Sequence, residues 1–159
     1  MDNAKIISLE QTENGGLFTI CYESKDESEF ENFINRFKDD ATCKEDLHVI
    51  LTAIQRMLDV SGFIVRRFRP VGKMKDCVCA IPVTTSKLRL YCLRISDSIL
   101  IVGNGGRKQT KTYEESDELN GYVIKLQKLD ALIKAELKQG SLTINGTMLD
   151  GINDKTFKL

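Results

Sequence analysis

The chain has 159 residues, of which 42% are apolar and 29% charged, with 11 glycines and 2 prolines. This composition is typical of a folded globular domain and excludes disordered, collagen-like and disulfide-stapled chains. Five cysteines, an odd number, predict reduced thiols, and a single histidine leaves no second ligand group for zinc. No apolar run is long enough to span a bilayer and no signal peptide is recognisable. We therefore expect a soluble, cytoplasmic protein with no metal or other cofactor.

Charge is distributed unevenly along the chain, although the formal net charge is zero. Residues 1–60 carry a net charge of −7, residues 61–113 carry +9 and residues 114–159 carry −2. A block of one sign is typical of a surface that contacts phosphate or an acidic partner, because a solvated surface normally mixes its signs. Chance clustering of exposed cations remains the alternative.

The first part of the chain is predicted to fold as a hairpin followed by two helices. Alternating side chains indicate strands at 5–9 and 17–22, joined by the turn Asn14-Gly15-Gly16. Apolar residues then recur every three or four positions in 26–40 and again in about 44–59, which indicates two amphipathic helices.

After Gly62 the apolar period changes from about 3.6 to 2, which predicts a sheet. The expected strands, with a basic loop at 69–75 between the first two, are 63–69, 77–83, 87–95 and 99–102. A third helix is expected over about 113–138, capped by Thr112 with Glu115, and a short strand at 142–144. We therefore expect one α+β domain over 1–159, in which the N-terminal helices pack on one face of a central antiparallel sheet.

Residues suited to phosphate chemistry gather near the end of the predicted sheet. The segment 103–111 is glycine-rich, carries three cations and precedes a helix, so its backbone N–H groups can contact phosphate, although a plain turn is the alternative. On the preceding strand, Arg89 and Tyr91 share one face because side chains alternate along a strand. An arginine held on a strand can stabilise charge that develops on a phosphate. The alternative interpretation is that Arg89 is a plain surface cation. The only histidine, His48, lies on the polar side of the second predicted helix, which argues against a histidine-activated nucleophile.

The succession of these motifs resembles the RelE/ParE toxin superfamily, and within it the HigB-like branch. That branch has an L-R-[VLI]-[FLY] strand and, after a second strand, a K-K-T-x-K-T-P signature before a helix. The matching segments here are Lys87-Leu88-Arg89-Leu90-Tyr91 and Arg107-Lys108-Gln109-Thr110-Lys111-Thr112. The resemblance covers about 26–138 and implies a RelE-like fold with a C-terminal helix. The N-terminal hairpin and the tail after Lys138 would then be additions to that fold.

The resemblance also implies a function. The chain would be the toxin of a type II toxin–antitoxin pair, a metal-independent mRNA endonuclease that acts on the ribosome or on free mRNA and is inhibited by a cognate antitoxin. Arg89 would be the transition-state cation, and Lys108 and Lys111 the phosphate-contacting and proton-transferring lysines.

We assign RNA binding to six further cations of the middle block and to one tyrosine, namely Arg66, Arg67, Arg69, Lys73, Lys75, Tyr91 and Arg107. Two alternatives to an endonuclease stay open. One is a non-cleaving RelE/ParE-like module that binds and inhibits a macromolecular target. The other is a regulatory domain whose basic face docks an acidic protein.

Overall fold

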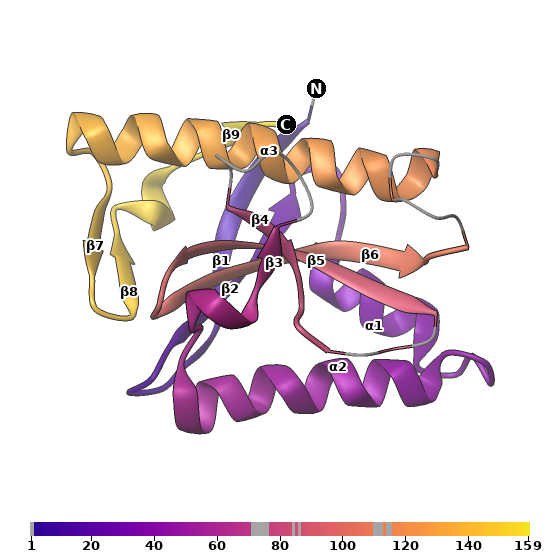
Figure 1. Ribbon diagram of the computed structural model, residues 1–159. Helices are drawn as coiled ribbons and strands as arrows, with labels where there is room; N and C mark the ends of the chain where they lie inside the picture. Colours follow the sequence, from indigo (N-terminus) through magenta and orange to yellow (C-terminus); the bar gives the residue numbers. More distant parts are fainter. Residues whose placement is uncertain (1, 71–76, 84, 86, 110–112, 114–115) are drawn as a thin grey trace.

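The computed structural model describes residues 2–70, 77–83, 85, 87–109, 113 and 116–159, with the backbone alone at Arg69 and Pro70. Within these ranges the chain folds into one large mixed β-sheet with helices on both of its faces (Figure 1). The α+β class expected from the change of apolar period is therefore confirmed.

The large sheet has the strand order β3-β4-β5-β6-β2-β1-β9. Its strands are β1 (Asn3–Gln11), β2 (Gly16–Tyr22), β3 (Arg69–Pro70), β4 (Val78–Ala80), β5 (Leu88–Ser96), β6 (Ile99–Arg107) and β9 (Phe157–Lys158). All neighbouring strands are antiparallel except β2 and β6, which run parallel. The expectation of a purely antiparallel sheet is therefore wrong. The reason is that two antiparallel units, β1–β2 and β4–β5–β6, join side by side, and no turn sets the direction in which they meet.

Two helices cover one face of this sheet. They are α1 (Glu29–Phe37) and α2 (Lys44–Arg56), and α2 continues into the π-helical turn η1 (Met57–Ser61). Ser28 and Glu31 form a capping box at the start of α1. The buried side chains on this face form the α2-side cluster, which includes Phe33, Phe37, Leu47, Ile50, Ile54, Leu88, Leu90, Leu100 and Val102.

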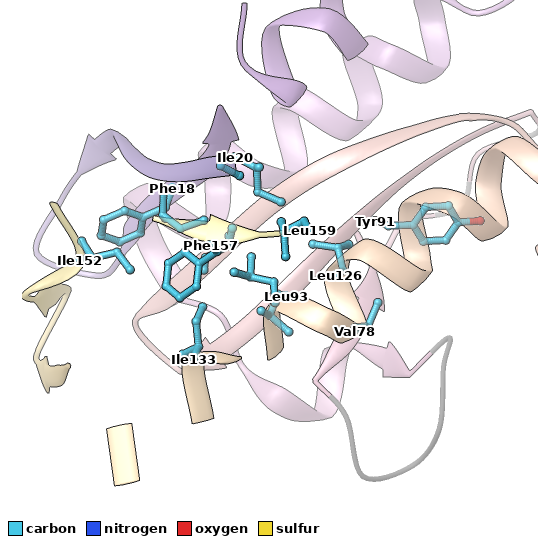
Figure 2. Close-up of a cluster of buried hydrophobic side chains, with 14 of the residues drawn as sticks. Phe18, Ile20, Val78, Tyr91, Leu93, Leu126, Ile133, Ile152, Phe157 and Leu159 are labelled. Atoms are coloured by element: carbon cyan, nitrogen blue, oxygen red, sulfur yellow. The ribbon is translucent and has the colours of Figure 1, made fainter. Parts of the chain in front are cut away.

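Helix α3 (Asp117–Gln139) covers the opposite face of the sheet (Figure 1). Its N-cap is Ser116, whose side chain accepts a hydrogen bond from the Leu119 N–H, and it ends at Gly140 with φ of 82°. The expected cap residues Thr112 and Glu115 lie outside the described residues. Figure 2 shows part of the α3-side cluster, which includes Phe18, Ile20, Val78, Tyr91, Leu93, Leu126, Ile133, Ile152, Phe157 and Leu159.

The C-terminal tail is built into this core. It contains the small hairpin β7 (Thr143–Asn145) and β8 (Met148–Asp150), the 3-10 turn η4 (Ile152–Asp154) and then β9. Phe157 and Leu159 are buried in the α3-side cluster, and β9 pairs with β1. The N-terminal hairpin and the tail therefore supply strands at one edge of the large sheet and side chains to the α3-side cluster.

The structure differs from the expected strands at two places. Residues 63–69 form the 3-10 turn η2 (Val65–Arg67) and the start of β3, because buried Phe63 and Phe68 flank exposed Val65 and do not alternate with it. The last long strand, β6, extends beyond Val102 as far as Arg107. Among the described helices, none combines the length and the apolar composition that a bilayer span requires.

Candidate functional site

Arg89 lies on β5 and projects to the α3 side of the sheet. Its neighbours Leu88 and Leu90 are buried in the α2-side cluster, and side chains alternate along a strand. The guanidinium Nη1 donates to the carbonyl oxygen and the hydroxyl of Thr85, at 3.0 and 2.9 Å, and to the Leu88 carbonyl at 2.9 Å. Arg89 therefore holds the segment that leads into β5, in addition to placing a charge on the sheet.

Lys108 continues the ladder between β5 and β6. Arg89 lies opposite Gly106, and two residue pairs further along the Lys108 N–H donates to the Lys87 carbonyl at 2.8 Å. Alternation along β6 assigns Lys108 to the same side of the sheet as Gly106 and Arg89. These two candidate catalytic residues are thus assigned to one face, with Arg89 on β5 and Lys108 directly after the end of β6.

Tyr91 also lies on the α3 side, as alternation from Arg89 predicts. Its ring is 2% exposed and packs edge-on against Tyr113, with ring centroids 6.3 Å apart. Figure 2 shows the ring at one end of the α3-side cluster, with its hydroxyl oxygen directed away from the aliphatic side chains. Burial raises the pKa of Tyr91 to about 12 against the opposing effect of the Arg89 charge, so the phenol stays protonated at neutral pH. The ring belongs to the core and is not an exposed platform for a base.

Arg107 lies on the other face of the sheet from Arg89. Its Nη2 donates to both carboxylate oxygens of Asp40, at 3.1 and 2.9 Å, and to the Thr42 hydroxyl. Hydrogen bonds from Thr42, and then from Arg107, lower the pKa of Asp40. Arg107 therefore ties the end of β6 to the segment between α1 and α2, and the structure does not bring it together with Arg89.

The remaining predicted RNA-binding cations are dispersed. Arg66 and Arg67 are exposed on η2, close to α2, and only the backbone of Arg69 is described. Lys73, Lys75 and the predicted catalytic residue Lys111 lie outside the described residues. The positive block at 61–113 is thus divided between the two faces of the sheet.

The glycine-rich run has a different role from the one expected. Gly103, Gly105 and Gly106 lie within β6, which pairs with β5, and do not form a turn before a helix. A Cβ atom on Gly105 would overlap the carbonyl oxygen of Arg89, and one on Gly106 would lie 3.1 Å from the Glu118 carboxylate. These glycines therefore allow close approach of backbone and side chains. The prediction that Gly103–Gly106 form a phosphate-binding turn before a helix is wrong.

A buried polar network at β6 is the feature that the sequence analysis missed. Gly103 and Asn104 together face Tyr91 in the ladder, which is a β-bulge. Asn104 is 3% exposed, accepts hydrogen bonds from Arg36 and from the Gly105 N–H, and donates to Asn32 at 3.0 Å. The one signal in the sequence is that Asn104 interrupts a run of apolar residues and glycines.

Arg36 connects this network to the start of α3. Its Nη2 donates to the Gly105 carbonyl at 2.7 Å, and its Nη1 forms an ion pair with Glu118 at 2.9 Å. The guanidinium also lies over the Tyr122 ring, 5.9 Å from its centroid. A pocket of about 410 Å³ opens beside it, lined by Arg36, Phe37, Arg107, Gln109, Ser116 and Glu118. Both of its arginines are paired with carboxylates, so the pocket is close to electrically neutral.

All five cysteines are free thiols. Within the described ranges, no group of three or more cysteine, histidine or acidic side chains is arranged to hold a metal ion. Comparisons with protein-family models, with curated proteins and with solved structures found no match.

Proposed function

We propose that this chain is the RNA-directed toxin of a type II toxin–antitoxin pair, with Arg89 and Lys108 contacting a phosphate of mRNA. The observation that supports this is the shared face of Arg89, on β5, and Lys108, directly after the end of the neighbouring strand β6. Arg89 lies opposite Gly106, and the Lys108 N–H donates to the Lys87 carbonyl two residue pairs further along. Two cations at the end of a strand pair can contact one phosphate from two directions.

The proposed reaction is attack of an RNA 2′-hydroxyl on the adjacent phosphate, which needs a base, an acid and cations around the transition state. The described hydrogen bonds of Arg89 all come from Nη1, so the Nε–Nη2 edge of its planar fork is the edge assigned to phosphate oxygens. Lys108 contacts the phosphate, and Lys111 enters the proposal through the resemblance alone. A cognate antitoxin would inhibit by covering this face.

A second candidate function is a module that holds its target without cutting it. Tyr91, beside Arg89, keeps its proton because burial raises its pKa to about 12. His48, the only imidazole of the chain, lies on α2 across the sheet. Neither Tyr91 nor His48 is therefore placed to act as the general base beside Arg89, and this favours the non-cleaving alternative.

Induction of the protein in bacterial cells tests the proposal. We expect growth arrest that a co-expressed antitoxin relieves, with new mRNA 5′ ends on mapping. Arg89→Lys keeps the charge but removes the planar fork, so cleavage should fall by about 100- to 1000-fold. Growth arrest without new 5′ ends would favour the non-cleaving module, and absence of toxicity would remove both candidates.

Thr85→Val is the matched control for Arg89. It removes one hydroxyl that accepts from Nη1 but leaves the guanidinium in place. If Arg89 acts on RNA, Thr85→Val should retain most of the cleavage that Arg89→Lys loses. Equal loss in the two variants would mean that Arg89 only anchors the segment before β5.

A further inference from the structure

A second surface of the molecule combines an apolar groove with cations. A pocket of about 410 Å³ lies between α2 and the segment after β4. Its apolar walls are Val49, Ala53, Met57, Pro82 and Val83. Because α2 covers the face opposite α3, this groove is on the other side of the sheet from the side chain of Arg89. It therefore requires an explanation separate from the proposed RNA site.

Two arginines of this pocket are available for an anionic partner. Arg56, at the end of α2, and Arg67, on η2, both line the pocket and are exposed. Within the described part of the chain neither forms an ion pair, whereas Arg36, Arg94 and Arg107 are each paired with a carboxylate. The groove thus carries positive charge that the described residues do not neutralise.

Exposed apolar side chains also lie on the elements that line the pocket. Val49, in its wall, is 41% exposed, and Val60 and Val65 are 71% and 60% exposed. Val60 follows the lining residue Met57 by three positions, and Val65 precedes Arg67 by two. Exposed apolar residues that cluster near a groove and are bordered by charge are typical of protein–protein contact sites. Exposed valines on α2, η1 and η2, each of which lines the pocket, favour a polypeptide over a small molecule.

We propose that this groove docks an acidic amphipathic helix of a partner protein. Apolar side chains at i, i+3 or i+4 and i+7 of that helix would enter the pocket beside Val49 and Ala53. Its carboxylates would face Arg56 and Arg67, and this charge complementarity selects an acidic helix over a basic one. The apolar walls favour protein over RNA, because a phosphate backbone gains little from valine and methionine side chains. The proposal does not use Arg89 or Lys108, so it can stand or fall independently of the proposed function.

Binding of synthetic peptides, measured by fluorescence anisotropy on the full chain, tests this docking surface. The probes are an amphipathic helical peptide with leucine on one face and glutamate beside it, a scrambled peptide of the same composition, and a copy with lysine in place of glutamate. We expect the first peptide to bind and the scrambled one to bind at least about tenfold more weakly, because only the first presents an apolar face. Failure of the acidic amphipathic peptide to bind, or equal binding of the scrambled one, would overturn the proposal.

Charge reversal gives the decisive comparison. The double variant Arg56→Glu with Arg67→Glu should lose affinity for the acidic peptide by about tenfold or more and gain affinity for the lysine peptide. Val49→Ser makes the apolar wall polar, so it should weaken binding of the acidic peptide and of the lysine peptide alike. The control Lys128→Glu reverses one positive charge in the same way, but on the exposed side of α3. This variant should bind the acidic peptide as the parent protein does. Loss of acidic-peptide binding in Lys128→Glu as well would show that net charge, not the groove, controls binding.

A single-stranded RNA oligonucleotide, measured on the same variants, separates the protein partner from a nucleic acid. We expect the RNA not to displace the acidic peptide. Competitive displacement, together with loss of RNA binding in the double variant and no effect of Val49→Ser, would assign Arg56 and Arg67 to RNA and overturn the docking of a helix.

Discussion

Arg36 of α1 donates a hydrogen bond to the side-chain oxygen of Asn104 in the bulge of β6. Through the same guanidinium, α1 also bonds to the Gly105 carbonyl and to Glu118 at the start of α3. One side chain thus joins a helix on one face of the sheet, the bulge itself and the helix on the opposite face. Lys108, of the proposed RNA site, follows the bulge by four residues.

Replacement of Asn104 should destabilise the fold. Asn104→Ala leaves the Gly105 N–H and the buried Glu29 carboxylate without the partner that Asn104 provides. Loss of a partner at buried polar groups costs about 1–3 kcal/mol, which urea unfolding would measure. Asn35→Ala is the control, since exposed Asn35 bonds only at the surface to Glu27, and it should change stability by less than about 0.5 kcal/mol. Equal effects of the two changes would show that the bulge network adds no stability.

Two glycine-to-alanine changes should have opposite signs. A Cβ at Gly105 would overlap the Arg89 carbonyl, so Gly105→Ala must separate β5 from β6 and should destabilise by more than about 3 kcal/mol. Gly121 lies inside α3 with nothing within 4 Å of its would-be Cβ, so Gly121→Ala should stabilise by about 0.4–1 kcal/mol. Thermal unfolding of both variants checks the pair. A mild effect at Gly105 would contradict the β5–β6 register.

The tail should contribute strongly to stability. Phe157 is 4% exposed in the α3-side cluster, and Phe157→Ala should cost about 3–5 kcal/mol. Ile144, on β7, is 41% exposed, so Ile144→Ala should cost less than about 1 kcal/mol. Chemical denaturation of the two variants measures the difference. A cost at Phe157 no larger than at Ile144 would mean that β9 is only loosely attached.

Tyr91 predicts a loss of stability at high pH. Burial raises its pKa from the ordinary value near 10 to about 12. Between those values the unfolded chain has released the phenolic proton while the folded chain still holds it, so stability falls as the pH rises. Tyr91→Phe removes this contribution, and its unfolding free energy should fall less steeply between pH 10 and 12. Parallel pH profiles of the variant and the parent protein would refute the assignment.

Local features of the chain could be predicted from its sequence. Phe33 and Phe37, four residues apart, indicated a helix with one apolar face, and both are buried on α1. Alternation indicated that Arg89 and Tyr91 share a face of a strand, and this too is confirmed. Both inferences depend on the backbone period of a single element, which neighbouring residues set by themselves.

Only the tertiary structure decided how these elements meet. The parallel pairing of β2 with β6, the bulge at Asn104 and the contacts of Arg36 all join segments that are far apart in the chain. The register of β5 against β6, in which Leu88 pairs with Arg107, also places Arg89 and Arg107 on opposite faces of the sheet, where they bond to different partners. Periodicity carries no information about which distant backbone pairs with which, because that choice depends on the fit of whole faces and on the partners available to buried polar groups.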